Sequence, residues 1–514
     1  MEELLGNLYD SKILKSVSKF NTWVRSSWKL EAYSRCVDKI NTGAIDRHAV
    51  YDPMNNNDHL EQMRFSHDTL LEYSIEMITR YPRLAQLISD SYPYFFIDEY
   101  QDTAESVIRI VSRLNNNAIK VGHHFWFGCF GDPVQSIYEN GIGDGLEDKL
   151  RNENVVYEVV EKPFNRRSTS NIINVGNKVR ADKHLQKSIY EDSEGLEPRF
   201  FYMDKSADLD EQTDNFINKI KKDYSINDNN RLHCFVLTNE YLAKSLHIDN
   251  IWNYFKSLKY YDRRTGNVIS TELLSHDVGK LGSVQKKIYD IVRFLTYINT
   301  SSTFLDIFPK EILNNMTFDD VSELICICKS FKQSTLYDSI KSMDEYCSNE
   351  FTELAECRAK QMVQIFAENG VSIYETLERE MMDIFYRDVD DTVIPKQEIA
   401  AFLNLTIDEF ILWFNHVERI ESSSVVYHTY HGTKGLEYDN VLIIMDAKWG
   451  RDTEYFPRLF KSYGPGKGED NKGARNLLYV ATTRAKKNLI VLYRDSITAF
   501  EEEVSSIFPV IEKY

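Results

Sequence analysis

The chain has 514 residues, enough for several domains, and its 42% hydrophobic and 27% charged residues are ordinary for a soluble globular protein. Its net charge of −18 argues against a protein that coats nucleic acid through bulk positive charge, although a local basic groove is compatible with it. No stretch is long and apolar enough to span a membrane, and the first residues lack the basic end and apolar centre of a signal peptide. We therefore expect a cytoplasmic protein without a membrane partner.

The cysteines form neither an extracellular-looking disulfide framework nor a familiar metal site. The last four, Cys326, Cys328, Cys347 and Cys357, have a spacing that matches none of the zinc patterns. Buried free thiols in helices are therefore expected here rather than a metal or an iron–sulfur cluster.

In chain order, residues 1–90 are predicted to be helical, since apolar residues recur at helix-like intervals in segments such as Asp68–Arg80. Residues 91–138 are predicted to form a strand, a helix and a second strand, His124–Phe130. Both strands end in polar residues, which is typical of a parallel sheet with a site at the carboxyl ends of its strands.

Further along, Val155–Val160 is predicted to be a strand, and Ser168 is predicted to cap a helix with a buried apolar stripe. A short buried strand is expected at Leu232–Thr238. The composition of residues from about 240 to 424 predicts an inserted, mostly helical subdomain. Alternating chemistry returns at Val425–Met445 and again at Leu477–Tyr493.

The segment Phe95–Thr103 (FFIDEYQDT) is the most informative stretch of the chain. Its apolar run stops at Asp98 and Glu99, so a buried strand would end in two adjacent carboxylates. One of them can hold Mg²⁺ while the other polarises an attacking water, which is the division of labour that phosphoryl transfer needs. The alternative is a strand followed by an acidic turn without a catalytic role.

The string DEYQDT resembles motif II of the UvrD/Rep-like superfamily 1A helicases, and four further segments resemble that family's motifs in the same order. Phe130–Tyr138 (FGDPVQSIY) resembles motif III, and Phe164–Ser168 (FNRRS) resembles motif IV. His428–Tyr438 (HTYHGTKGLEY) resembles motif V, and Leu478–Ala485 (LYVATTRA) resembles motif VI. Five motifs in this order leave little room for a chance match.

The resemblance implies catalytic roles for five residues. Asp98 would hold Mg²⁺ and Glu99 would act on the attacking water, while Gln135 would sense the γ-phosphate of ATP. Arg167 would also contact the γ-phosphate, and Arg484 would be the arginine finger that stabilises the transferring phosphoryl group. For Arg167, which follows Arg166 at a predicted helix start, the alternative is solvated surface charge.

The resemblance also implies contacts with nucleotide and DNA. Arg166 replaces an aromatic residue that packs on the adenine, and a guanidinium plane can also stack on a base. Gly435 lets the backbone approach phosphate or ribose, and Glu437 matches a residue placed near the ribose. Thr429, His431 and Lys434 match the part of motif V that links ATP to the DNA backbone. The family's base-stacking aromatic after motif III is replaced here by Asn140, so Tyr138 is the substitute DNA contact, with core packing as the alternative.

The implied fold is α/β, with two RecA-like lobes, the first incomplete, and a mostly helical inserted subdomain. We assign residues 1–90 to a helical N-terminal segment like the family's 1B region, and 91–164 to the partial first lobe. Residues 165–240 and 425–514 would form the second lobe, and 241–424 the helical insertion, like the 2B region. The catalytic side chains would then converge on one cleft between the lobes, where ATP and Mg²⁺ bind.

No segment matches G-x-x-x-x-G-K-[ST], the loop that cradles nucleotide phosphates. In the family this loop precedes motif II, so we expect the chain to begin after it, and expect weak ATP binding and little turnover by this chain alone. Two functions stay open. One is an ATP-dependent DNA helicase or translocase subunit that moves 3′ to 5′ on single-stranded DNA in repair or anti-phage defence. The other is a hydrolysis-deficient DNA-binding or scaffolding subunit that works with a nuclease.

The compact size and the style of the motifs also resemble the helicase subunits of Gabija-like anti-phage systems. That resemblance implies a protein partner of the OLD-family nuclease type, in addition to single-stranded DNA.

Overall fold

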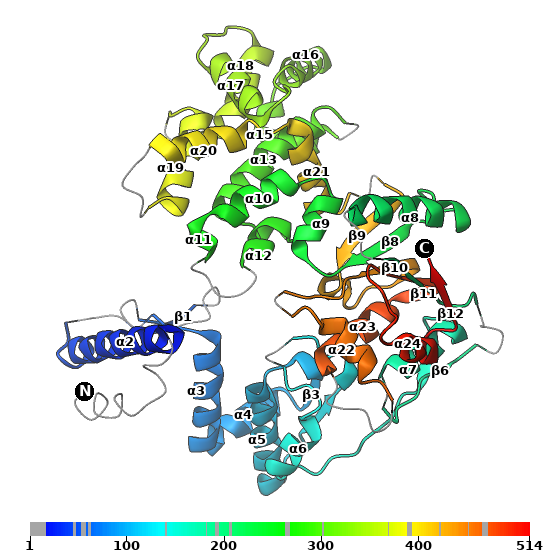
Figure 1. The fold of residues 1–514 in the computed structure, drawn as a ribbon. Helices are drawn as coiled ribbons and strands as arrows, with labels where there is room; N and C mark the ends of the chain where they lie inside the picture. Colours follow the sequence, from blue (N-terminus) through cyan, green and yellow to red (C-terminus); the bar gives the residue numbers. More distant parts are fainter. Residues whose placement is uncertain are drawn as a thin grey trace. The chain divides into compact units, whose positions relative to one another are not determined.

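The chain divides into two compact units, Met1–Glu161 and Lys162–Tyr514. The structure is a computed structural model, and Figure 1 shows its ribbon. It describes residues 17–44, 48–52, 58–59, 63–138, 141–180, 182–190, 195–204, 208–262, 268–300, 303–367, 370–387, 393–420, 423–450, 452–464 and 471–514. The expectation of helix over residues 1–90 therefore falls partly outside the described residues.

The first unit contains a pair of parallel strands with helices packed around it. Its helices are α2 (Val17–Asn41), α3 (His67–Arg80), α4 (Pro82–Ser91), α5 (Glu105–Val121) and α6 (Leu146–Asn152), with short 3-10 turns η2 (Tyr100–Asp102) and η3 (Pro133–Gln135). Its strands are β1 (Val50–Tyr51), β2 (Arg64–Phe65), β3 (Tyr94–Ile97) and β4 (Trp126–Cys129). The helix predicted over Asp68–Arg80 is confirmed as α3, and the predicted strand–helix–strand is confirmed as β3, α5 and β4.

The pairing of β3 with β4 positions the first part of the candidate site. The two strands are parallel, with Ile97 opposite Cys129. Helix α5 connects them and packs Ile108 and Val111 against Ile97 in one buried cluster. Because the strands run in the same direction, the residues that follow Ile97 and Cys129 lie at the same edge of the pair.

The second unit is built on a parallel sheet in which six of the described strands take part, in the order β12-β7-β11-β10-β8-β9. The strands of the unit are β5 (Phe164–Asn165), β6 (Lys187–Ser188), β7 (Arg199–Tyr202), β8 (Leu232–Val236), β9 (Val425–Thr429), β10 (Tyr438–Met445), β11 (Ala485–Tyr493) and β12 (Val510–Lys513). All neighbouring pairs in this sheet are parallel, as the RecA-like expectation requires. Strand β9 lies at one edge.

Helices cover both faces of this sheet (Figure 1). Those before and after the insertion are α7 (Ser170–Arg180), α8 (Leu209–Asp223), α9 (Asn239–Ser245), α22 (Tyr455–Lys461), α23 (Lys472–Thr482) and α24 (Glu501–Ile507). Side chains alternate along β7, so this strand contributes to the core on both faces of the sheet. Phe201 packs on Phe216 of α8, and Phe200 packs on Phe460 of α22. The sheet is therefore buried on both sides, as its apolar strands predict.

The stretch between β8 and β9 is helical apart from its loops and short turns. It contains α10 (Asp249–Ser257), α11 (Lys259–Asp262), α12 (Val268–Leu274), α13 (Ser283–Tyr297), α14 (Phe304–Ile307), α15 (Lys310–Leu313), α16 (Phe318–Lys329), α17 (Leu336–Cys347), α18 (Leu354–Gln364), α19 (Ile373–Phe385), α20 (Val393–Leu403) and α21 (Ile407–Val417), with the 3-10 turn η4 (Val278–Lys280). One continuous apolar core runs from Leu442 in the sheet to Trp413 in α21. The insertion is thus packed directly onto the sheet rather than tethered to it.

Two local predictions are wrong. Val155–Val160 forms no strand, because no described strand pairs with it, and Val156 is left 94% exposed. Ser168 does not cap a helix, since α7 begins two residues later at Ser170 and the Ser168 hydroxyl instead donates to the Ala485 carbonyl at 2.7 Å. The buried stripe predicted for this helix is confirmed by residues such as Ile172 and Val179.

The described residues contain neither a candidate membrane span nor a metal-binding cluster. Among them there is no helix with the length and apolar character needed to cross a membrane. The same residues contain no group of three or more His, Cys, Asp or Glu side chains arranged to hold a metal ion.

Candidate functional site

In the first unit, the two acids of DEYQDT follow β3 directly. Asp98 and Glu99 are both exposed, and the Asp98 carboxylate accepts the Glu99 backbone N–H at 2.9 Å. Glu99 has φ 48° and ψ 47°, a left-handed conformation that costs a residue with a Cβ about 1 kcal/mol. Strained backbone of this kind is concentrated at functional sites, and here it turns the chain so that both carboxylates stand clear of the sheet.

The side chain of Gln101 ties these acids to the second strand. Gln101 is fully buried, and its amide donates to a Glu99 carboxylate oxygen at 2.5 Å. Its amide oxygen accepts the backbone N–H of Asp132 at 3.2 Å, just beyond the end of β4. One buried amide therefore fixes the Glu99 carboxylate relative to the turn that carries Gln135.

Two glycines make room for this amide. A Cβ on Gly131 would lie 2.2 Å from the Gln101 amide oxygen, and a Cβ on Gly141 would lie 2.2 Å from the Gln101 carbonyl oxygen. Neither position can therefore carry a side chain without displacing Gln101 or the backbone around it. The Gly143 N–H donates to that carbonyl at 2.9 Å, so the chain beyond Tyr138 also closes onto Gln101.

Gln135 lies in η3 beside the acids of β3. The Asp132 carboxylate caps this turn by accepting the Val134 N–H at 3.1 Å and the Gln135 side-chain amide at 3.3 Å. Burial, followed by the charge of Asp132, raises the pKa of Tyr100 to about 12, so its hydroxyl stays protonated. Tyr138, a predicted DNA contact, is 49% exposed.

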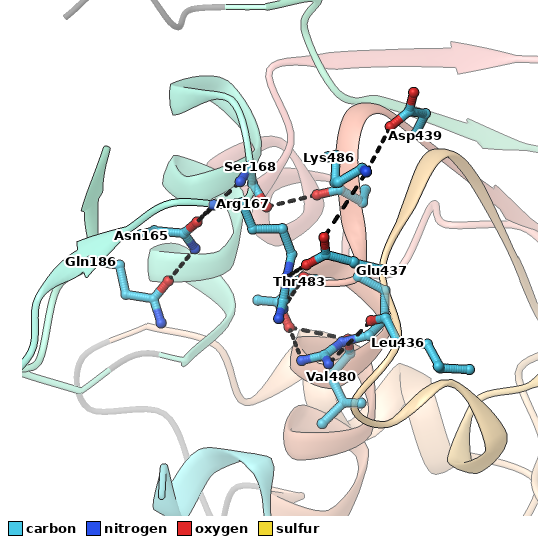
Figure 2. A network of polar contacts seen from close by, with 12 residues as sticks. Asn165, Arg167, Ser168, Gln186, Leu436, Glu437, Asp439, Val480, Thr483 and Lys486 are labelled. Carbon is cyan, nitrogen blue, oxygen red and sulfur yellow. Dashed lines mark hydrogen bonds and ion pairs between the residues drawn. The ribbon is translucent and has the colours of Figure 1, made fainter. Parts of the chain in front are cut away.

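In the second unit, the segments that resemble motifs IV, V and VI meet around Arg167 (Figure 2). The Arg167 Nε donates to the Glu437 carboxylate at 2.7 Å, and its terminal nitrogen donates to the Thr483 carbonyl at 3.1 Å. Asn165 holds the turn in place, because its side-chain oxygen accepts the N–H groups of Arg167 and Ser168. Three segments, the first of which lies 270 positions before the second, thus form one network.

The predicted arginine finger, Arg484, is turned into the protein. Its side chain is 2% exposed, and it donates to the Val480 carbonyl at 3.0 Å, the Leu436 carbonyl at 3.4 Å and the Thr483 hydroxyl at 3.2 Å. In this conformation Arg484 braces the loop that carries Glu437, and it would have to leave these contacts to meet a phosphate.

The segment that resembles motif V runs from the edge strand β9 into the 3-10 turn η5 (His431–Thr433). The Thr429 hydroxyl oxygen at the end of β9 accepts the Gly432 N–H at 3.1 Å, which closes the turn. The His431 ring lies 5.8 Å from the Trp449 ring, and Lys434 is half-buried. Gly435 has φ 78°, a conformation that favours glycine, and the space around its Cα is open.

Lysines surround the acids that follow this turn. Lys486 lies 4.0 Å from Glu437 and 3.2 Å from Asp439, and Lys487 donates to Asp439 at 2.7 Å. Arg166, the predicted adenine contact, is exposed beside Arg167. The region therefore offers several cations together with the half-exposed Glu437 carboxylate, a charge pattern suited to an anionic ligand that carries hydroxyl groups.

Within each unit the structure brings the predicted residues together. Asp98, Glu99 and Gln135 share one edge in the first unit, and Arg167, Glu437 and Arg484 share one network in the second. The sequence reasoning missed the connecting residues, above all Gln101, Asn165 and Thr483. The Gln of DEYQDT and the Asn of FNRRS stand inside the motifs themselves, which is the signal that could have identified them.

Each of the two units matches a known domain family. Residues 8–140 match the UvrD/REP helicase N-terminal domain, and residues 163–496 match the UvrD-like helicase C-terminal domain. The second match alone covers more than half of the chain, and the two matches fall on either side of the boundary between the units.

Individual relatives agree with this placement. The chain is 36% identical over 518 aligned positions to the Gabija protein GajB of Bacillus cereus (strain HuB5-5), covering 98% of this chain and 74% of that relative. It is 23% identical to the ATP-dependent DNA helicase PcrA of Staphylococcus epidermidis, covering 82% of this chain and 58% of that protein. It is 21% identical to DNA helicase II of Haemophilus influenzae, over 83% of this chain and 59% of that helicase. The chain therefore belongs to the UvrD-like helicase family.

Proposed function

We propose that this protein is a DNA translocase subunit that couples ATP hydrolysis to 3′-to-5′ movement on single-stranded DNA, and that it works in anti-phage defence with a nuclease partner. Family membership supports the helicase class, and the similarity to the Gabija protein GajB supports the defence role. The observation that carries the proposal is the network around Arg167, which joins three motif segments and leaves Arg166 and Glu437 at the surface.

In the proposed mechanism the residues that follow β3 and those around Arg167 have different roles in ATP hydrolysis. Asp98 would hold Mg²⁺, for which a carboxylate oxygen is a suitable ligand, and the ion would neutralise charge on the phosphates. Glu99, held by the Gln101 amide, would accept a proton from the attacking water, while Gln135 would sense the γ-phosphate. Arg167 and Arg484 would supply positive charge to the transferring group.

The remaining predicted residues would bind the base, the ribose and DNA. Arg166 would stack on the adenine, and Glu437 would accept a hydrogen bond from the ribose where Gly435 allows a close approach. Single-stranded DNA would contact Thr429, His431 and Lys434, which match the family's DNA-linked positions, and Tyr138 as the substitute for the family's base-stacking aromatic. Because Thr429 and Glu437 flank one short turn, DNA contact and nucleotide contact would move together.

The second candidate is a helicase-like scaffolding subunit that binds DNA without hydrolysing ATP. The observation that favours it is the burial of Arg484, whose guanidinium is satisfied by Val480, Leu436 and Thr483 rather than presented to a ligand. In that case the network would stabilise the fold and present the DNA-binding turn without any chemical step.

Because little turnover is expected of the chain alone, ATP turnover is measured on its complex with the proposed nuclease partner, with and without single-stranded oligothymidylate, and this separates the two candidates. The Glu99→Gln variant keeps Asp98 but loses the proton acceptor, so turnover should fall roughly 10²- to 10⁴-fold while DNA affinity stays unchanged. The matched control is Glu76→Gln, which removes an exposed acid from α3 in the same unit. DNA binding by the wild type together with turnover no higher than that of Glu99→Gln would support the scaffolding role instead.

A second measurement tests direction. Streptavidin bound to a biotin at the 5′ end of the oligonucleotide should be displaced by a 3′-to-5′ motor, whereas streptavidin at the 3′ end should not. Displacement only from the 3′ end would contradict the proposed direction while leaving ATP-driven movement intact.

A further inference from the structure

A cavity of about 840 Å³ lies in the second unit along β9, the edge strand of the sheet. Four consecutive residues of β9 line it: Val425, Val426, Tyr427 and His428. Consecutive residues of a strand point to opposite faces of its sheet. A cavity that touches all four therefore follows the edge of the strand rather than one face, and we name it the β9 groove.

The main chain of β9 has hydrogen-bonding capacity on its groove side. The Ser424 carbonyl accepts the Leu232 N–H at 2.9 Å, and the Tyr430 N–H donates to the Val236 carbonyl at 3.1 Å, so the even-numbered positions face β8. In a parallel ladder only alternate residues of a strand bond to a given neighbour. The main-chain groups of Tyr427 and Thr429 therefore point outward, and within the described ranges no strand pairs with that side.

The walls of the groove supply apolar surface and charges of both signs, the latter including Asp214, Asp249, Lys221 and Arg419. One wall contains Ile217 of α8, Tyr241 and Lys244 of α9, and Leu246 at the end of α9. Lys244 forms an ion pair with Asp210. The other wall residues are Leu412, Asn415 and His416 of α21, Arg419 two residues beyond the end of α21, and His276 in the loop after α12. Arg419 is exposed, lies just beyond the end of α21 with φ 55°, and makes no ion pair among the described residues.

We propose that the β9 groove binds an extended peptide segment of a partner protein, which adds a strand to β9 and places an acidic side chain against Arg419. An open strand edge presents N–H donors and C=O acceptors in alternation, and another peptide backbone complements that pattern. A nucleic acid strand would supply phosphate acceptors but no matching row of donors. Strand β9 spans about 16 Å, which is room for an added strand of roughly five residues.

The interaction has consequences for the motor, because the groove continues past β9 to Gly432 and Leu436 in the segment that resembles motif V. A strand bound there would lie directly beside the turn that Thr429 closes. The inference does not depend on ATP hydrolysis, since a scaffolding subunit would offer the same groove.

The test is selection from a phage-displayed library of random peptides of roughly seven residues, which exceeds the length of the edge. The full chain serves as bait beside two variants at one position. Tyr427→Pro removes the outward N–H but no bond to β8, as proline at a sheet edge allows. Tyr427→Val loses the same ring but keeps the N–H. Wild type and Tyr427→Val should enrich the same peptides, and Tyr427→Pro should not.

A selected peptide is then synthesised with and without N-methyl groups on alternate amides, and its affinity is measured by calorimetry. Methylation should abolish binding, and Arg419→Gln should weaken it about tenfold because a charge-assisted contact is lost. Arg387→Gln, an exposed arginine in the same unit, should change nothing. The proposal is overturned if no peptide is enriched over Tyr427→Pro, if the methylated peptide binds equally well, or if single-stranded oligothymidylate displaces the peptide from the groove.

Discussion

Arg167 and Glu437 lie 270 positions apart in the sequence, and the Arg167 Nε donates to the Glu437 carboxylate at 2.7 Å. The same guanidinium reaches the Thr483 carbonyl, so a single side chain joins the segments that resemble motifs IV, V and VI. If nucleotide binds here, this contact transmits a structural change in any one of the three segments to the other two.

The first prediction concerns that ion pair. Glu437→Ala should change the free energy of unfolding by less than about 1 kcal/mol, because Arg167 and Glu437 are 31% and 48% exposed and solvent screens the pair. The KM for ATP should nevertheless rise, since the ribose contact and the orientation of Arg167 are both lost. Thermal unfolding and steady-state kinetics check the two effects, with Asp223→Asn as control because it breaks an exposed pair with Lys219. A large loss of stability with an unchanged KM would show that the contact is structural only.

The second prediction concerns Gln101. Gln101→Glu replaces a buried amide that donates to Glu99 by a carboxylate that cannot donate, and it sets two acids against each other. We expect a loss of about 1–3 kcal/mol of stability in the first unit, measured by urea unfolding at neutral pH. Gln364→Glu, at an exposed position of α18, makes the same change of charge and should be neutral within about 0.5 kcal/mol. Equal stability of the two variants would contradict the bridging role of the amide.

The third prediction is a gain of stability at Gly176 in α7. A Cβ there would meet the Thr483 side chain at 3.5 Å and Tyr479 at 3.9 Å, which are ordinary van der Waals contacts. Alanine is favoured over glycine inside a helix, so Gly176→Ala should stabilise the second unit by about 0.5–1 kcal/mol. Gly141→Ala, where the added carbon would collide with the Gln101 carbonyl, should destabilise the first unit. Thermal unfolding of both variants measures the contrast, and a lower midpoint for Gly176→Ala would refute the prediction.

The fourth prediction concerns pH. Burial lowers the pKa of His428 to about 3 and the pKa of its stacked neighbour His233 to about 4. Both values lie below 6.5, so the unfolded chain takes up these protons first. The stability that the neutral pair contributes is present above about pH 6.5 and is lost progressively as the pH falls toward about 4.

Urea unfolding between about pH 7 and about pH 5 measures this slope. In His428→Asn the slope should be smaller by about one titrating group, which is roughly 1.4 kcal/mol per pH unit. His184→Asn, which removes an exposed histidine, should leave the slope unchanged. An identical slope in wild type and His428→Asn would mean that this histidine does not titrate differently in the folded chain.

The sequence by itself determined the local parts of this protein. The apolar run before Asp98 was enough to predict β3, and the periodic apolar residues of Asp68–Arg80 were enough to predict α3, because strand and helix periodicity are properties of neighbouring residues. The order of the motif strings was enough to predict the family.

Only the tertiary structure decided what depends on partners far along the chain. Val155–Val160 has strand-like residues but forms no strand, because a strand exists only with a hydrogen-bonded neighbour and its own sequence does not specify one. Burial is decided in the same way. The resemblance to motif VI predicts that Arg484 is an arginine finger, but in the structure the carbonyls of Leu436 and Val480 hold its guanidinium inside the protein. The position of β9 at the sheet edge, and therefore the groove beside Tyr427, follows from the order in which distant strands pair, which no local pattern encodes.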